Sequence, residues 1–326
     1  MPEVQTTYRE AIRTALGDAL RADPRVVLLG EDIAAAGGSF KVTDGLVEEF
    51  GTRVMDTPIS ETGFIGASVG MALVGYRPIA ELMFADFAGV AFDQIVNEAA
   101  KYLYLSAGQM SVPMVIRTVG GAGLGFASQH SQTTESWYLS VPGLKVVVPS
   151  NPQDAYGLLL SAVQDPNPVI YIEHKRLYAQ RGPLDTDQGA VPLGKASTVR
   201  SGRDITVVAT LAMVPEALKA AEKLARDGIE VEVVDLRCLM PLDLDTVIDS
   251  VTRTSRLLVV EEQTVSGGWG GHVVASVCER ALEVLDLPPA RMGTAPAPIP
   301  FSSRLEELAV PGADSILRQI KAMLGR

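Results

Sequence analysis

The sequence is poor in the residues that build metal sites and disulfide frameworks. Its 326 residues include three histidines and two cysteines, Cys238 and Cys278, which lie far apart in apolar surroundings. We therefore expect reduced thiols, as in a cytosolic protein. Neither a cysteine-ligated metal nor a disulfide framework is supported.

Long apolar runs and basic clusters are also missing. No apolar run approaches the roughly 20 residues that a membrane-spanning helix needs, and residues 1–16 predict an amphipathic helix rather than a signal sequence. The net charge is −11 and no block of Lys and Arg occurs, so binding to nucleic acid or to an anionic membrane is not expected. We expect a soluble cytoplasmic protein. Its 47% hydrophobic and 21% charged residues predict that partner proteins cover part of its surface.

Two common nucleotide-binding motifs are absent. The glycine-rich segment 120–125 lacks the GxGxxG spacing of dinucleotide-binding folds, and no GxxxxGK[ST] phosphate loop occurs. Functions that depend on nicotinamide cofactors or ATP are therefore not supported.

Two successive α/β patterns are present. Between residues 26 and 174, short strand-like runs alternate with helical ones: VVLLG, RVMDT, RPIAELMF, VPMVIRT, LKVVVPS and PVIYIE. Runs that are apolar on both faces predict a parallel sheet covered by helices. A second set of strands, DITVVAT, EVEVVDLR and RLLVVEE, alternates with helices expected near residues 215–227, 244–252 and 271–285. We predict an α/β fold of two three-layer α/β/α domains with mainly parallel sheets, residues 1–180 and 204–326, joined by a linker at 181–203.

The segment 56–87, DTPISETGFIGASVGMALVGYRPIAELMFADF, contains the main candidate for a catalytic group. Glu61 follows a predicted strand and precedes a helix expected over residues 63–75. Open α/β sheets bind ligands at such junctions, and the apolar neighbours Ile59, Phe64 and Ile65 would raise the pKa of a carboxyl group. The spacing alone equally favours a helix start, with Ser60 as the capping residue and Glu61 at the positive end of the helix dipole.

Several motifs in the same order resemble one family over nearly the whole chain. They are LLGEDI (28–33), DTPISE (56–61), RPIAELMFADF (77–87), FDQIVNEAAKY (92–102), QHSQ (129–132), PGLKVVVPS (142–150), VVDLRCLMPLD (233–243) and VVEEQ (259–263). The sequence resembles the β-subunit of the thiamine-diphosphate-dependent first component of 2-oxoacid and acetoin dehydrogenase complexes. The resemblance implies a transketolase-like pyrimidine-binding domain followed by a transketolase-like C-terminal domain.

The resemblance also implies roles for individual residues around the thiamine diphosphate. Glu61 would bond the aminopyrimidine ring and favour its imino tautomer, with Phe87 stacked on that ring and Ile59 beside it. Glu31 resembles the acidic residue that connects paired active sites, although it also fits a solvated turn. Without the motif, Phe87 would be interpreted as an ordinary aromatic residue of the core.

His130 lies in a glycine-rich loop that follows a predicted strand, where side chains commonly reach an active site. Its imidazole titrates near neutral pH and suits proton transfer, whereas a lone loop histidine is usually a polar surface residue. The QHSQ motif resembles the family's motif around a histidine that assists acyl transfer to lipoamide. The role of His174 stays open.

The resemblance further implies a potassium ion, although its residues also form an ordinary polar turn. The ion would be held by oxygen atoms of four residues: Met114, Ala162, Asp165 and Asn167.

The chain also lacks the diphosphate-binding motif of thiamine enzymes. The GDG…NN pattern with which thiamine enzymes hold Mg²⁺ and the diphosphate does not occur in the chain. We therefore expect an α-subunit to supply that half of the site in an α2β2 heterotetramer, and a lipoyl-bearing acyltransferase core to receive the acyl group.

The expected substrate is pyruvate, a branched-chain 2-oxoacid or acetoin. Two alternatives stay open. A self-sufficient transketolase-like enzyme conflicts with the missing diphosphate motif. A non-catalytic assembly or regulatory subunit conflicts with the joint presence of Glu61, Phe87 and His130.

Overall fold

A computed structural model describes residues 4–325 of the chain, which form two compact units. The first unit contains the residues up to Gly120 and Trp137–Leu193, and the second contains Gly121–Ser136 and the residues from Gly194 onward. The second unit thus takes in a segment, Gly121–Ser136, that the sequence prediction assigned to the first domain. No helix within residues 4–325 has the length and apolar character needed to cross a bilayer.

The first unit is built on a parallel sheet with the strand order β6-β7-β5-β4-β2-β3. The strands are β2 (Val26–Gly30), β3 (Val54–Asp56), β4 (Arg77–Leu82), β5 (Val115–Gly120), β6 (Lys145–Val147) and β7 (Val169–His174). All residues of β2, β5 and β7 are buried, as expected for strands covered on both faces.

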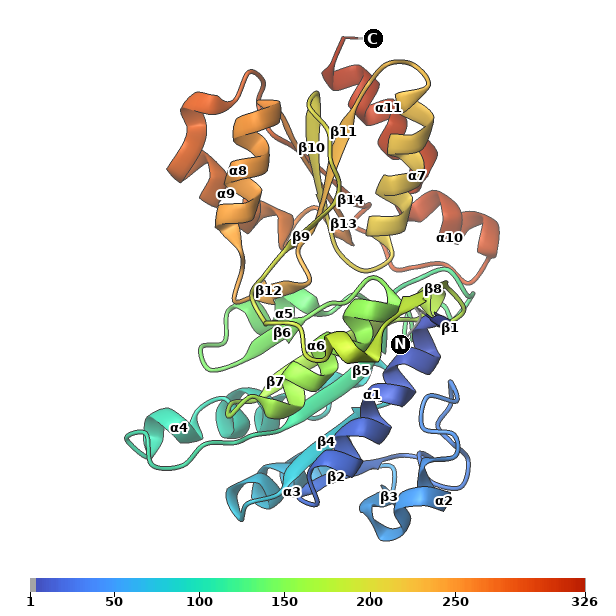
Figure 1. Ribbon diagram of the computed structural model, residues 1–326, viewed down its shortest axis with the longest axis vertical. Helices are drawn as coiled ribbons and strands as arrows, with labels where there is room; N and C mark the ends of the chain where they lie inside the picture. The colour runs from blue at the N-terminus through green and yellow to red at the C-terminus, as the bar shows by residue number, and fades with distance from the viewer. Residues whose placement is uncertain (1–3, 326) are drawn as a thin grey trace. The chain divides into compact units, whose positions relative to one another are not determined.

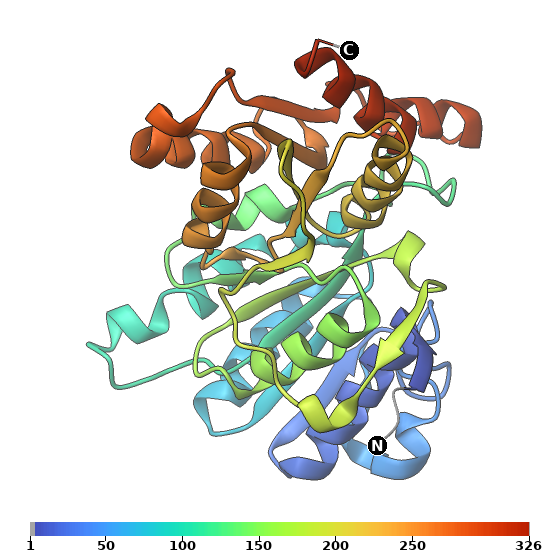
Figure 2. The same cartoon turned by 45° about the horizontal axis from the view of Figure 1, so that its top comes forward.

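Helices cover both faces of this sheet (Figures 1 and 2). α1 (Tyr8–Ala22) and α6 (Pro152–Gln164) lie side by side on one face, and α3 (Glu61–Leu73) packs with the π-helical turn Gln94–Ala99 on the other. α1 begins with a capping box between Thr7 and Glu10, which satisfies two backbone N–H groups at the helix start. The short helices of this part of the chain are α2 (Leu46–Phe50), α4 (Tyr102–Leu105) and α5 (Glu135–Leu139).

The second unit has a sheet with the strand order β14-β13-β10-β11-β9, in which only β9 is antiparallel. Its strands are β9 (Ser197–Arg200), β10 (Ile205–Ala209), β11 (Val231–Asp235), β13 (Leu257–Thr264) and β14 (Ala290–Thr294), and a short strand β12 (Cys238–Met240) follows β11 in the chain.

Helices flank this second sheet on both sides, with α7 (Met213–Ala225) and α11 (Ala313–Met323) on one side and α8 (Leu244–Thr254) and α9 (Gly270–Ala281) on the other (Figure 1). α10 (Ser303–Ala309) precedes α11. The predicted α/β class with mainly parallel sheets is therefore confirmed.

The predicted linker at residues 181–203 contains two short strands. β8 (Arg181–Leu184) pairs with β1 (Val4–Thr7), and β9 pairs with β11 at the sheet edge. β8 contains Gly182 and Pro183, which are tolerated in short edge strands. Each of the two strands has only four residues, which is too short for a clear hydrophobic period.

Candidate active site

Glu61 is the first residue of α3, two residues earlier than the predicted start of that helix. Ser60 occupies the N-cap position, but its side chain makes no capping hydrogen bond. The Glu61 side chain is buried, at 9% exposure, together with Phe64 and Ile65. Ile59 is 85% exposed and adds nothing to this burial in the isolated chain. The predicted capping hydrogen bond of Ser60 is therefore absent. Glu61 still lies at the helix start, where a negative charge interacts favourably with the helix dipole.

Glu31 follows β2 and is close enough to Glu61 for their charges to interact. It is 7% exposed, and its Oε1 has no hydrogen-bond partner among the described residues. Burial raises the pKa of Glu31, and the charges of Glu61 and Asp32 raise it further. The two acids thus form a pair at the carboxyl edge of the neighbouring parallel strands β2 and β3, where open α/β sheets bind ligands.

Phe87 lies just beyond β4, the strand on the other side of β2. It belongs to the 3₁₀ turn Ala85–Gly89 and is half-buried. Its ring packs edge-on against Phe84, with 5.6 Å between the ring centroids. Glu31, Glu61 and Phe87 therefore follow three adjacent strands at one edge of the sheet.

A buried charge network that the sequence analysis did not identify ties β4, β5 and β7 together at this sheet. The Arg117 guanidinium donates to Glu81 Oε2 at 2.5 Å and to both carboxylate oxygens of Glu173, with Nη2 at 3.0 Å from Oε2. The Tyr178 hydroxyl donates to the same Glu173 oxygen at 2.7 Å. Burial raises the pKa of Glu173 and of Tyr178. Removing one member would leave a buried charge uncompensated and should destabilise the protein.

His130 lies in the second unit, within the segment Gly121–Ser136. The segment is irregular, and Gly121, Gly123, Gly125 and Ala127 all have a positive φ. Its base is closed by the Gly121 N–H, which donates to the Gln132 carbonyl at 3.2 Å. His130 is half-buried there, as expected for a side chain carried on a loop.

His174 lies in the first unit, at the end of β7. It is 1% exposed, and its Nδ1 accepts a hydrogen bond from the Arg176 N–H at 3.2 Å. This ring therefore has a local structural hydrogen bond.

Three of the four predicted potassium residues, Ala162, Asp165 and Asn167, are bonded to one another, and Asp165 also pairs with Lys145. Lys145 forms an ion pair with Asp165 Oδ2, and the Asn167 N–H donates to Asp165 Oδ1 at 2.9 Å. The Ala162 carbonyl accepts from the Asp165 N–H at 3.3 Å, and the Met114 carbonyl from Val169 at 3.0 Å. The Asp165 carboxylate is thus paired with Lys145, and the potassium site stays a prediction. Within residues 4–325, no group of three or more His, Cys, Asp or Glu side chains is arranged to hold a metal ion.

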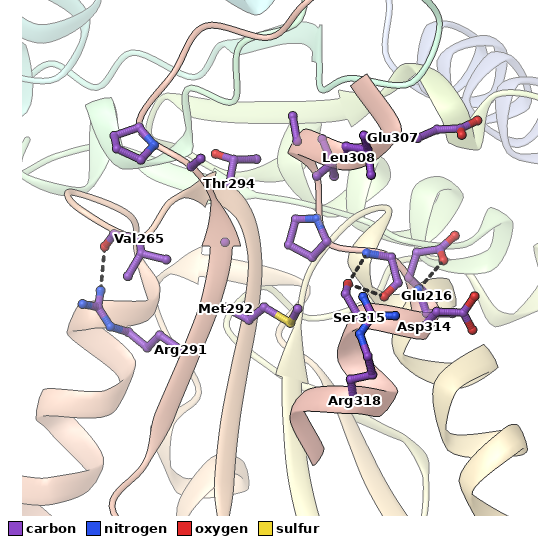
Figure 3. Close-up of a pocket in the computed structure, with 18 of the residues that line it drawn as sticks. Glu216, Val265, Arg291, Met292, Thr294, Glu307, Leu308, Asp314, Ser315 and Arg318 are labelled. Carbon is purple, nitrogen blue, oxygen red and sulfur yellow. Dashed lines mark hydrogen bonds between the residues drawn. The ribbon is translucent and has the colours of Figure 1, made fainter. Parts of the chain in front are cut away.

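A large cavity of about 1140 Å³ lies in the second unit, between β14 and the start of α11 (Figure 3). None of the predicted site residues lines it. The α11 N–H groups at its wall already have partners, because Ala313 donates to Glu216 Oε2 at 3.0 Å and Gly312 to Ser315 Oγ at 2.9 Å. The cavity is therefore not the candidate active site.

Comparison with known proteins agrees with the two-unit architecture. Residues 4–180 match the family described as "Transketolase, pyrimidine binding domain", and residues 194–316 match "Transketolase, C-terminal domain". A solved structure titled "Split gene transketolase, inactive beta4 tetramer" superimposes with a TM-score of 0.80 over 98% of both chains, at 24% identity. This likeness shows the fold.

Two curated relatives are similar over nearly the full length. One is "Pyruvate dehydrogenase E1 component subunit beta-2, mitochondrial" of Oryza sativa subsp. japonica, which is 44% identical over 97% of this chain and 86% of the relative. The other is "Acetoin:2,6-dichlorophenolindophenol oxidoreductase subunit beta" of Bacillus subtilis, which is also 44% identical, over 97% of this chain and 96% of the relative. The resemblance stated from the motifs is confirmed.

Proposed function

The chain belongs to the family of transketolase-like β-subunits that includes those of the pyruvate dehydrogenase E1 component and of acetoin oxidoreductase, and we propose that it is the β-subunit of a thiamine-diphosphate-dependent dehydrogenase component. It decarboxylates pyruvate or a branched-chain 2-oxoacid, or cleaves acetoin, and transfers the acyl group to lipoamide on an acyltransferase core. The two kinds of relative are equally similar to this chain, at 44% identity each.

The observation that carries this proposal is the acid pair at the edge of the first sheet. Glu31 and Glu61 are both buried, and Glu31 Oε1 has no partner among the described residues. A buried acceptor without a partner is costly in an isolated protein. The unpartnered Glu31 Oε1 therefore fits a site that is completed by a polar ligand such as an aminopyrimidine ring.

The chain's own residues would bind and orient the cofactor and control one proton. The chemistry that thiamine diphosphate supplies when bound is cleavage of a carbon–carbon bond next to a carbonyl group. Glu61 would hold a proton at a nitrogen of the pyrimidine ring, and Phe87 would provide a face for that ring to stack on. Because the pKa of Glu31 is raised, this acid retains its proton to a higher pH than an ordinary Glu.

An α-subunit would supply the Mg²⁺ and diphosphate half of the site in an α2β2 assembly, since this chain lacks the GDG…NN pattern. Exposed apolar side chains support the presence of partner chains. In the isolated chain the exposed fractions are 85% for Ile59, 58% for Val90, 86% for Tyr104 and 71% for Leu105.

The proposal is tested by measuring turnover of the chain alone and with its co-encoded α-chain. Pyruvate, branched-chain 2-oxoacids and acetoin would be compared, with an artificial electron acceptor and then with a lipoyl domain. We expect turnover only in the assembled protein. Tight, Mg²⁺-dependent binding of thiamine diphosphate by the pure β-chain, measured by calorimetry, would contradict a shared site. Assembly without turnover on any of these substrates would favour a non-catalytic subunit.

His130 is assigned to the second half of the reaction. We expect His130→Ala to lower transfer to the lipoyl domain more than turnover with the artificial acceptor, because the artificial acceptor bypasses acyl transfer. Equal losses in the two assays would instead assign His130 to substrate binding or to the earlier bond cleavage. No loss in either assay would make it an ordinary loop residue.

A further inference from the structure

The segment Gly121–Ser136, here called the histidine loop, is held by carboxylates of its own unit. The Ala122 N–H donates to Glu262 Oε1 at 2.6 Å. The N–H groups of Gly123 and Gly125 donate to Glu306 Oε1 and Oε2, at 2.6 and 3.0 Å. Gly123 and Gly125 have φ values of 105° and 70°, which side chains with a Cβ rarely adopt. The glycines thus allow two backbone N–H groups to meet at one carboxylate.

Glu306 is unusual among the acids of α10. It is 2% exposed, whereas its neighbour Glu307 is exposed. No Lys, Arg or His in residues 4–325 forms an ion pair with Glu306. A buried carboxylate is stable only when hydrogen bonds or opposite charges compensate for its lost hydration. Here the compensation comes from the two N–H groups of the histidine loop, through charge-assisted hydrogen bonds.

The other end of the loop is fixed by Gln263, which follows Glu262 on β13. Its Nε2 donates to the Thr133 carbonyl at 3.0 Å and to Glu135 Oε2 at 2.7 Å. Its Oε1 accepts from the Ser136 hydroxyl at 2.5 Å. Both ends of the loop are therefore bound to buried side chains, and residues 126–132, which include His130, lie between them.

We infer that Glu306 is a positioning residue for His130. Its carboxylate holds Gly123 and Gly125 so that the loop presents the imidazole in one conformation. The inference rests on the proposed function, in which His130 serves acyl transfer. It assigns a role to a residue 176 positions away in the chain from the group it positions, through hydrogen bonds that the sequence does not indicate.

The first test measures the loop itself and is independent of activity. Hydrogen exchange of the Gly123 and Gly125 amides would be followed in the full chain, alone and assembled with its α-chain. Glu306→Gln and Glu306→Ala should raise their exchange rates roughly tenfold to a hundredfold, since a hydrogen bond to a charged group contributes that much to an equilibrium. Glu307→Gln, on the exposed side of the same helix, is the matched control and should leave both rates unchanged.

The second test measures function with the same variants. Glu306→Gln should lower kcat for transfer to a lipoyl domain, while turnover with the artificial acceptor changes less. Rapid exchange of these amides in the parent protein, or equal exchange in the parent and Glu306→Gln, would overturn the inference even if the alanine variant fails to fold. Absence of turnover in the parent would contradict the proposed function, and the exchange result would still stand on its own.

Discussion

Glu135, at the end of the histidine loop, should make the stability of the folded chain depend on pH. This side chain is 3% exposed, and burial raises its pKa from 4.5 to about 8, with further contributions from the charges of Glu262 and Glu261. At neutral pH the folded protein therefore holds a proton on Glu135 that the unfolded chain has released. The free energy of unfolding should fall as the pH rises from about 4.5 to about 8.

The size of this effect follows from the two pKa values of Glu135. A difference between 4.5 and about 8 corresponds to at most roughly 5 kcal/mol over that pH range. Glu261, whose pKa burial raises to about 7, contributes in the same direction over a narrower range. Glu135→Gln removes the titrating group and retains an amide that can bond to Gln263. The variant should therefore show a shallower loss of stability between pH 5 and pH 8.

The chain offers a local probe for this measurement. It has two tryptophans, and Trp269 is buried in the second unit, where its backbone N–H donates to Gln263 Oε1 at 3.3 Å. In a Trp137→Phe background, fluorescence during urea unfolding reports Trp269 alone. Glu307→Gln provides the control, because an exposed acid should leave the pH dependence unchanged. If the stability of Glu135→Gln fell as steeply with pH as that of the parent, the assignment of a proton to Glu135 would be wrong.

Three further predictions concern the first unit. Glu61→Gln should lower turnover by about 10²- to 10⁴-fold at an unchanged melting temperature, as for loss of a positioned proton-transfer group, and turnover within about threefold of the parent would leave Glu61 only its place at the helix start. Phe87→Ala should raise the cofactor concentration needed for half-maximal turnover roughly fivefold, equivalent to about 1 kcal/mol; an unchanged requirement would identify a core aromatic. Asp165→Ala should erase any stabilisation by potassium over lithium in melting experiments, and equal melting temperatures of the parent in both salts would remove the ion site.

The hydrophobic pattern predicts the architecture well because buried parallel strands have a distinctive sequence. Runs such as VVLLG and ITVVA are apolar on both faces, and all their residues are buried. The start of α3 was predicted two residues too late, because the expected helix began after Glu61, whereas the acidic residue itself occupies the favourable first turn. Element boundaries depend on such local terms and are harder to predict than the elements.

Other parts of the sites were missed because their partners are distant in the sequence. Acidic residues are usually exposed, so Glu306 in a short polar helix gave no sign that it bonds to glycines 181 and 183 positions away. The sequence around Arg117 could have predicted the buried charge network. It stands in a strand predicted to be apolar on both faces, and a buried guanidinium needs carboxylate partners. Glu81 and Glu173, each in a similar strand, are the partners found.

The discontinuous make-up of the second unit has a consequence for gene engineering. A fragment encoding only the residues from Gly194 onward would lack the loop whose amides donate hydrogen bonds to Glu262 and Glu306. In that fragment the two acids would lose these hydrogen bonds. The fragment should therefore express poorly even though its sheet is complete. A chimera of two relatives joined near residue 193 would likewise combine the glycine loop of one parent with the acids of the other. The loop and α10 are therefore best inherited together from a single parent.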